Sequence, residues 1–432
     1  MHDLIEFLWP HRLPLLYAVV IVAVLPLLAG YVVLLERKVM ADMQARLGPM
    51  RVGPHGLLQP IADALKLLLK EDVIPDKADK WIFWMAPIVS VGAGLLAFAA
   101  LPFGPAFLIA DLNIGLLFIV AISSMGIFGI VLGGWASNSH YSLLGALRSA
   151  AQLVSYEVAG GMALVSGVLL AGTLSTKEMV EVQSAQGVWF VFLSPMAFFI
   201  YLVASVAETN RAPFDMPEAE SELVAGYMTE YSGFRWSLYF LAEYANMIVV
   251  AGIATTLFLG GGARPFASVG VLNFLDFFPA FFFVGVAGYC FFRAPKQPVL
   301  VQKIVMAAFG GLCLLLATPL GLAATVRHTW MPAVHGGFWF VAKVMAYVYV
   351  FLWIRFTFPR YRFDQLMHLG WFFLIPLSIV NVMSLGIGLV LNREAGWNLW
   401  GAMGLSTVAT LAVALGLAHS GEQRPGVAES EA

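Results

Sequence analysis

The acidic residues are the side chains of this sequence whose types and spacing could carry chemistry. Between positions 208 and 222 there are five carboxylates and one arginine, although only 12% of the 432 residues are charged. Three more acidic residues lie in or beside apolar segments. Carboxyl groups held close together in apolar surroundings can exchange protons near neutral pH. The sequence therefore predicts a proton path through Glu157, Glu208, Asp215, Glu218, Glu220, Glu222, Glu230 and Glu243.

Two structural interpretations of these acids stay open. The 208–222 segment could be a solvated acidic loop that leads into a helix, because Pro217 suits a first turn and carboxylates there interact well with the helix dipole. The acids inside apolar segments could form structural salt bridges with Lys303 or Lys343. Phe214 and Met216 are unusual in a purely solvated loop, and charged groups at membrane depth usually belong to ion or proton pathways. Both observations favour proton handling.

The segments that would position these acids are long and apolar. Hydrophobic residues make up 60% of the chain, and its mean hydropathy is +0.84, which is typical of a polytopic α-helical membrane protein. A spanning helix needs about 20 apolar residues. Eleven segments meet that criterion, so we predict an all-α fold with spans at 13–35, 81–103, 112–132, 154–172, 188–207, 237–259, 271–292, 299–326, 337–358, 370–391 and 397–418.

Basic residues predict the orientation of these spans. With the N-terminus outside, the inside segments carry 17 of the 24 Lys and Arg residues and the outside segments carry 5. The 208–236 loop is then cytoplasmic. The first inside loop contains an amphipathic pattern at 57–70, which is too short to span and predicts a helix on the membrane surface. A plain interfacial anchor is the alternative for that helix.

Other features bound the function further. Small residues on helix faces, among them Gly129, Gly133, Gly160, Gly161 and Gly167, predict close helix packing. The net charge of −2 gives no basic surface for a nucleic acid. The only cysteines are Cys290 and Cys313, and neither has a Cys or His neighbour at metal-ligand spacing, so we expect no zinc or iron–sulfur site.

Several long motifs make the chain resemble a known family. It is similar to the H subunits of bacterial proton-pumping NADH:quinone oxidoreductase, respiratory complex I. The matching segments are Glu36-Arg37-Lys38, 44–54, 56–63, 134–138, Ser155-Tyr156-Glu157, the whole of 208–222, Ala242-Glu243-Tyr244 and 359–367. Together they cover about 13–260 and 337–391 of this sequence.

The resemblance implies a multi-pass subunit of the bacterial cytoplasmic membrane that frames a quinone chamber. The first span, the surface helix and the sixth span would form the entrance. Arg46, Arg51, Asp63, Arg211, Phe214 and Asp215 would face the chamber. The acidic residues would link quinone reduction to antiporter-like membrane subunits. Quinone would be the substrate, peripheral quinone-module subunits and lipid would be further partners, and flavin mononucleotide and the iron–sulfur clusters would belong to other chains.

The chain also departs from this family, whose members usually have eight or nine spans. We predict family helices at 1–263, an inserted hairpin at 264–336, further family helices at 337–396, and an additional C-terminal span with a disordered tail at 397–432. Phe372 stands where the family typically has lysine, so no role of that lysine is carried over.

Two other functions remain open on the sequence. A homologous subunit of a membrane-bound hydrogenase could use the same fold to pump ions without a quinone. A stand-alone proton-coupled transporter could use the buried acids, but it would be active without partner chains, and no internal inverted repeat supports it.

Overall fold

A computed structural model describes residues 2–104, 108–215, 225–266, 270–296, 299–326 and 331–422. No strand occurs in these ranges, and the longer elements are all helices. They are α1 (His2–Met43), α2 (Gln59–Leu69), α3 (Lys80–Ala97), α4 (Gly115–Ala136), α5 (His140–Ala171), α6 (Thr176–Gln186), α7 (Phe190–Leu193), α8 (Pro195–Glu208), α10 (Gly233–Phe258), α11 (Phe278–Arg293), α12 (Leu300–Val326), α13 (Met331–Thr357), α14 (Phe363–His368), α15 (Ile375–Glu394) and α16 (Leu399–Glu422). Short helical turns join them, including η1 (Pro54–Gly56), η2 (Phe98–Ala100), η3 (Gly226–Met228), η4 (Gly270–Phe277), η5 (Ala294–Lys296) and the π-helical η6 (Leu369–Leu374).

The predicted all-α membrane fold is confirmed. Within the described ranges, ten helices are long and apolar enough to cross a membrane. The difference from eleven lies at 188–207, where the structure divides the apolar segment into α7 and α8. Ser194 has a non-helical backbone (φ −140°, ψ 71°), and Pro195 begins α8. With 14 residues, α8 is about 21 Å long, which is shorter than the roughly 30 Å hydrocarbon core of a bilayer.

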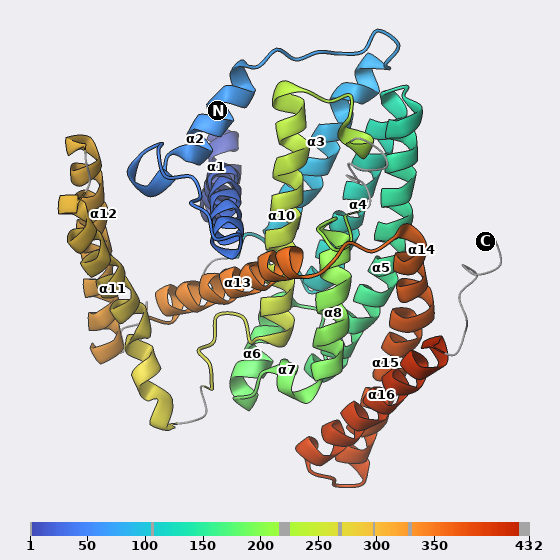
Figure 1. The fold of residues 1–432 in the computed structure, drawn as a ribbon. Coiled ribbons are helices and arrows are strands. Elements are labelled where there is room, and N and C mark those ends of the chain that lie inside the picture. Colours follow the sequence, from blue (N-terminus) through green and yellow to red (C-terminus); the bar gives the residue numbers. More distant parts are fainter. Residues whose placement is uncertain are drawn as a thin grey trace.

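The helix α10 forms the centre of the molecule. It is almost entirely buried along its second half, from Tyr244 to Phe258, and it contacts α1, α3, α8 and α13. Figure 1 shows α3, α4, α5, α8 and α10 running side by side, with α13 crossing α10. Small residues permit this packing: Gly94 of α3 meets Ala245, and Gly167 of α5 meets Leu257. Gly161 has no atom near its Cβ position within 4 Å, so close packing was wrongly expected there.

The predicted surface helix is present as α2. None of its residues is buried, and its apolar side chains Ile61, Leu65 and Leu68 are exposed, as a helix lying on a membrane requires. It contacts both α1 and α10. These three elements are therefore packed against one another, and their role as a chamber entrance stays a prediction.

Two helix pairs lie at opposite edges of the fold. The pair α11 and α12 occupies one edge, and α15 and α16 occupy the other (Figure 1). Ser384 of α15 is within hydrogen-bonding distance of Ser406 and Thr410 of α16, at 3.0 and 3.1 Å. Polar contacts of this kind join helices in a membrane. The domain boundaries at 264, 337 and 397, and the outside location of the N-terminus, stay predictions.

Candidate functional site

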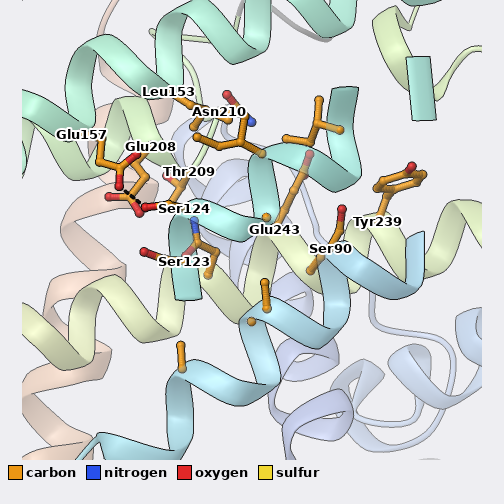
Figure 2. Close-up of a pocket in the computed structure, with 18 of the residues that line it drawn as sticks. Ser90, Ser123, Ser124, Leu153, Glu157, Glu208, Thr209, Asn210, Tyr239 and Glu243 are labelled. Atoms are coloured by element: carbon orange, nitrogen blue, oxygen red, sulfur yellow. Dashed lines mark hydrogen bonds between the residues drawn. The ribbon is translucent and has the colours of Figure 1, made fainter. Parts of the chain in front are cut away.

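A partly enclosed cavity lies where α3, α4, α5, α8 and α10 meet. The volume open to the centres of water molecules is about 70 Å³. One water molecule needs only about 10–15 Å³ of such volume, so several can fit. Its polar wall includes Ser90, Ser123, Ser124, Glu157, Glu208 and Glu243. Figure 2 shows Glu157 and Glu208 at one end of the cavity, Glu243 in the middle, and Tyr239 with Ser90 at the other end.

Glu157 and Glu208 face each other at their end of the cavity. Figure 2 shows the two carboxyl groups pointing toward one another, with Ser124 beside them. The Ser124 hydroxyl donates a hydrogen bond to Glu157 Oε1. A hydroxyl is both a donor and an acceptor, so Ser124 can exchange a proton with Glu157.

Glu243 connects the cavity to a buried arginine. Its Oε1 accepts a hydrogen bond from the Tyr227 hydroxyl at 3.1 Å, and its Oε2 lies 3.7 Å from Arg211 Nη2. Arg211 is only 6% exposed, and its guanidinium lies over the ring of Tyr244, 4.2 Å from the centroid. A buried cation needs such partners because desolvation of an isolated charge is costly.

Arg211 also reaches a second carboxylate outside the cavity. Its Nη1 lies 3.8 Å from Oε1 of Glu36, the same oxygen that pairs with Arg355. The Tyr244 hydroxyl donates to Glu36 Oε2 at 2.7 Å. We call Glu36, Arg211, Glu243 and Arg355 the ion-pair network. It has two carboxylates and two guanidinium groups, so its formal charges balance.

The loop after α8 places Arg211 by several contacts. Gln152 of α5 donates through Nε2 to the carbonyl oxygens of Ala207 and Phe214, both at 2.8 Å. The Phe214 ring stacks on Tyr361 with centroids 5.7 Å apart. Next to it, Asp215 Oδ2 accepts a hydrogen bond from Arg360 Nη2 at 3.0 Å. The loop is therefore held on both sides, by α5 and by the segment that precedes α14.

Comparison with known proteins identifies the family. The model of the NADH dehydrogenase family matches residues 15–386. The chain belongs to that family. An H subunit of NADH-quinone oxidoreductase from Solibacter usitatus is 55% identical, over 87% of this chain and 95% of its own length. An H subunit of the same enzyme from Koribacter versatilis is 51% identical over 84% and 88%, and one from Rickettsia typhi is 42% identical over 88% and 94%.

In this member of the NADH dehydrogenase family, the structure brings together only some of the predicted site residues. Glu157, Glu208 and Glu243 share the cavity. Asp215 is buried beside Arg360. Glu230 instead lines a separate, open pocket, and Glu218, Glu220 and Glu222 lie outside the described residues.

The predicted quinone-chamber residues occupy different surroundings. Arg211 and Phe214 are buried, whereas Arg46 and Arg51 are exposed. Asp63 on α2 pairs with Arg37 at 2.8 Å and accepts from Gln59 at 3.0 Å. The Arg37–Asp63 pair ties the surface helix to the end of α1. Their common role at a chamber stays a prediction.

Sequence reasoning missed two members of the ion-pair network. Neither Glu36 nor Arg355 was assigned to the site from the sequence, and each falls near the end of an apolar segment. Glu36 is 8% exposed, and Arg355 lies within α13. The available signal was a charged side chain followed by more apolar residues, as in Arg355-Phe356. Among the described residues, no group of three His, Cys, Asp or Glu is arranged to hold a metal ion.

Proposed function

We propose that this chain is the H subunit of a proton-translocating NADH:quinone oxidoreductase, and that it couples quinone reduction to proton movement through the acidic cavity. The observation that carries the proposal is that Arg211 lies between two carboxylates. It contacts Glu243 at the cavity and Glu36 outside it. The names of the relatives support the enzyme complex.

The proton path would run along acids with exchangeable partners. Glu157, Ser124 and Glu208 can store and transfer a proton, and water in the cavity would connect them to Glu243. A change of charge on Glu243 alters its attraction to Arg211, and the guanidinium can then favour Glu36 instead. Buried charge pairs respond strongly to such changes because the low dielectric screens them little. The acids at 218, 220, 222 and 230 would extend this path.

The quinone chamber would lie on the side of the loop that carries Phe214 and Asp215. Phe214 offers an aromatic face, and Asp215 with Arg360 offers polar groups that can exchange a proton or hydrogen bond. Arg46, Arg51 and Asp63 would line the approach beside α2. Quinone is the substrate; electrons would reach it from flavin mononucleotide and iron–sulfur clusters held by other chains.

The assembly would lie in the bacterial cytoplasmic membrane. Its membrane-arm subunits would continue the acidic path, and peripheral quinone-module subunits would complete the chamber at the predicted cytoplasmic loops. Lipid would cover the exposed apolar helix faces. None of these roles requires the chain itself to carry an electron.

The first test is NADH-driven quinone reduction by the assembly purified through a tag on this chain in mild detergent. We expect turnover that quinone-site inhibitors block. A complex that oxidises hydrogen but not NADH would replace the proposal with the hydrogenase-type alternative. A folded chain that purifies alone and transports protons would instead favour the transporter.

Variants then test the residues. We expect Glu157→Gln and Asp215→Asn to lower coupled quinone reduction at least about tenfold, because removing a proton-transfer group typically costs about 10²–10⁴-fold in that step. Asp111→Asn is the matched control, since Asp111 is exposed and pairs with Lys177 at 3.3 Å, away from the cavity. Full coupled activity in both test variants would contradict the assigned path.

A further inference from the structure

A second pocket lies at the end of the bundle where α4 meets α5 and α10 begins. It is open and has a volume of about 440 Å³. Its wall carries titratable and hydroxyl-bearing residues, which are Asp76, Lys77, Ser137, Ser139, His140, Tyr141 and Glu230. This end of the bundle is the upper one in Figure 1, and the distribution of basic residues predicts that it faces the cytoplasm.

Three hydroxyl groups lie between this open pocket and the acidic cavity. Ser137 is buried and lines the open pocket, and Tyr239 lines the cavity. The Tyr231 hydroxyl joins them in a cluster around Gly133, beside the Tyr239 oxygen and the Ser137 hydroxyl. The two tyrosine rings meet edge to face, with centroids 4.9 Å apart.

Gly133 on α4 creates the space for these hydroxyls. A Cβ atom at Gly133 would overlap the Tyr239 oxygen and lie 3.4 Å from the Tyr231 oxygen. Both phenol groups therefore converge on a residue of α4 that has no side chain. Ser137 lies one turn further along the chain, and its hydroxyl donates to the Gly133 carbonyl at 2.7 Å.

The hydroxyls are suited to passing protons. Burial raises the pKa of Tyr231 to about 12, although the hydroxyls of Tyr239 and Ser137 and the charge of Arg235 oppose that rise. Tyr231 therefore stays neutral at physiological pH and keeps both a donor and an acceptor. At the cavity end, the buried Ser90 oxygen has no hydrogen-bond partner among the described residues, and it lines the same cavity as Tyr239.

We propose that Ser137, Tyr231 and Tyr239 form a hydroxyl relay through which protons enter the acidic cavity from the open pocket. A proton delivered by His140 or Glu230, through pocket water, adds to the Ser137 oxygen while the hydroxyl proton moves on to Tyr231. Tyr231 and Tyr239 repeat that exchange, and cavity water carries the last proton to Glu243. The pocket loses one proton, Glu243 gains one, and each hydroxyl is restored when it rotates back.

Packing of the tyrosine rings alone does not require their hydroxyl groups. The rings of Tyr227, Tyr231 and Tyr239 pack edge to face, and phenylalanine would make the same contacts. The hydroxyl groups lie in the interior of the bundle, where each buried polar group needs a hydrogen-bond partner. Tyr239 donates to the Gly129 carbonyl at 3.1 Å, and Tyr231 makes a longer contact of 3.4 Å with the Phe83 carbonyl.

The relay rests on the proposed function, and its test separates the two. Tyr231→Phe, Tyr239→Phe and Ser137→Ala are each made in the complete complex, which is reconstituted into phospholipid vesicles. Tyr349→Phe is the matched control, because Tyr349 is an exposed tyrosine on α13. NADH-driven quinone reduction, proton translocation and the solvent deuterium isotope effect are measured, with NADH oxidation by an artificial acceptor as a check on the peripheral arm.

We expect both Tyr→Phe variants to lower the rate of proton translocation at least about tenfold. Coupled kcat falls with it, the KM for quinone is unchanged, and the isotope effect rises because proton entry becomes slow. Ser137→Ala changes the same quantities in the same direction. Wild-type translocation and isotope effects in correctly assembled tyrosine variants would overturn the relay. Failure of the unmodified complex to reduce quinone with NADH would instead refute the proposed function.

Discussion

The ion-pair network makes a quantitative prediction about Glu36. Its carboxylate is buried and interacts with Arg355, Arg211 and Tyr244. At the 3.8 Å separation from Arg211, a charge pair interacts by about 4 kcal/mol at an effective dielectric constant of about 20. Removing one member of a buried network typically costs about 3–5 kcal/mol, because the partner charges stay buried without compensation.

Glu36→Gln should therefore lower the kinetic stability of the assembly. We expect a loss of about 3 kcal/mol, which corresponds to about a 100-fold faster thermal inactivation if the network is broken in the rate-limiting step. The assay is the half-life of inhibitor-sensitive quinone reduction at a fixed temperature. Glu394→Gln, at an exposed position of α15, is the control and should leave the half-life unchanged.

A second substitution distinguishes charge balance from simple loss of a side chain. Arg355→Gln alone should also shorten the half-life, whereas Glu36→Gln combined with Arg355→Gln keeps one guanidinium and one carboxylate in the network. We expect the double variant to recover at least about 1 kcal/mol relative to the sum of the single effects, as coupled residues do. Strictly additive effects of the two substitutions would refute the argument that the buried charges compensate one another.

Two other predictions concern the packing of the site. Gly133→Ala should destabilise the assembly by about 1–3 kcal/mol and displace the Tyr239 hydroxyl, whereas Gly161→Ala, with open space at its Cβ position, should be tolerated; the thermal inactivation half-lives of the two variants give the comparison. Gln152→Leu removes both hydrogen bonds that hold the Arg211 loop from α5 and should lower coupled proton translocation more than NADH oxidation by an artificial acceptor. Equal losses in the two activities would show that Gln152 supports assembly rather than the coupling site.

Hydropathy predicted the spans because each spanning helix is a long apolar segment that can be recognised without its neighbours. It overlooked the break at Ser194-Pro195, since the residues on both sides are apolar and the window averages over them. Proline is well tolerated in the first turn of a helix, so Pro195 marks where α8 begins without changing the hydropathy. The result is an interior helix too short for the spanning criterion, although the sequence around it is continuous and apolar.

The candidate site was predicted less completely, because its geometry depends on residues far apart in the chain. Charge at membrane depth identified Glu157, Glu208 and Glu243 individually, and the structure places all three around one cavity. The pairing of Glu36 with Arg355 joins residues 319 positions apart, and no local pattern contains that information. The hydroxyl groups of Tyr227, Tyr231 and Tyr239 were also missed, since tyrosine is common in apolar membrane helices and at their ends.

The loop 209–215 offers a physical link between Asp215 and the ion-pair network that contains Arg211. Arg211 and Asp215 are four residues apart and lie in different contacts: Arg211 in the ion-pair network and Asp215 with Arg360. Phe214 fixes the backbone between them through its stacking on Tyr361 and its carbonyl bond to Gln152. A change in the charge or partner of Asp215 therefore acts on a loop with little freedom to absorb it. We therefore expect such a change to shift Arg211 and so to alter the balance between its contacts with Glu36 and Glu243.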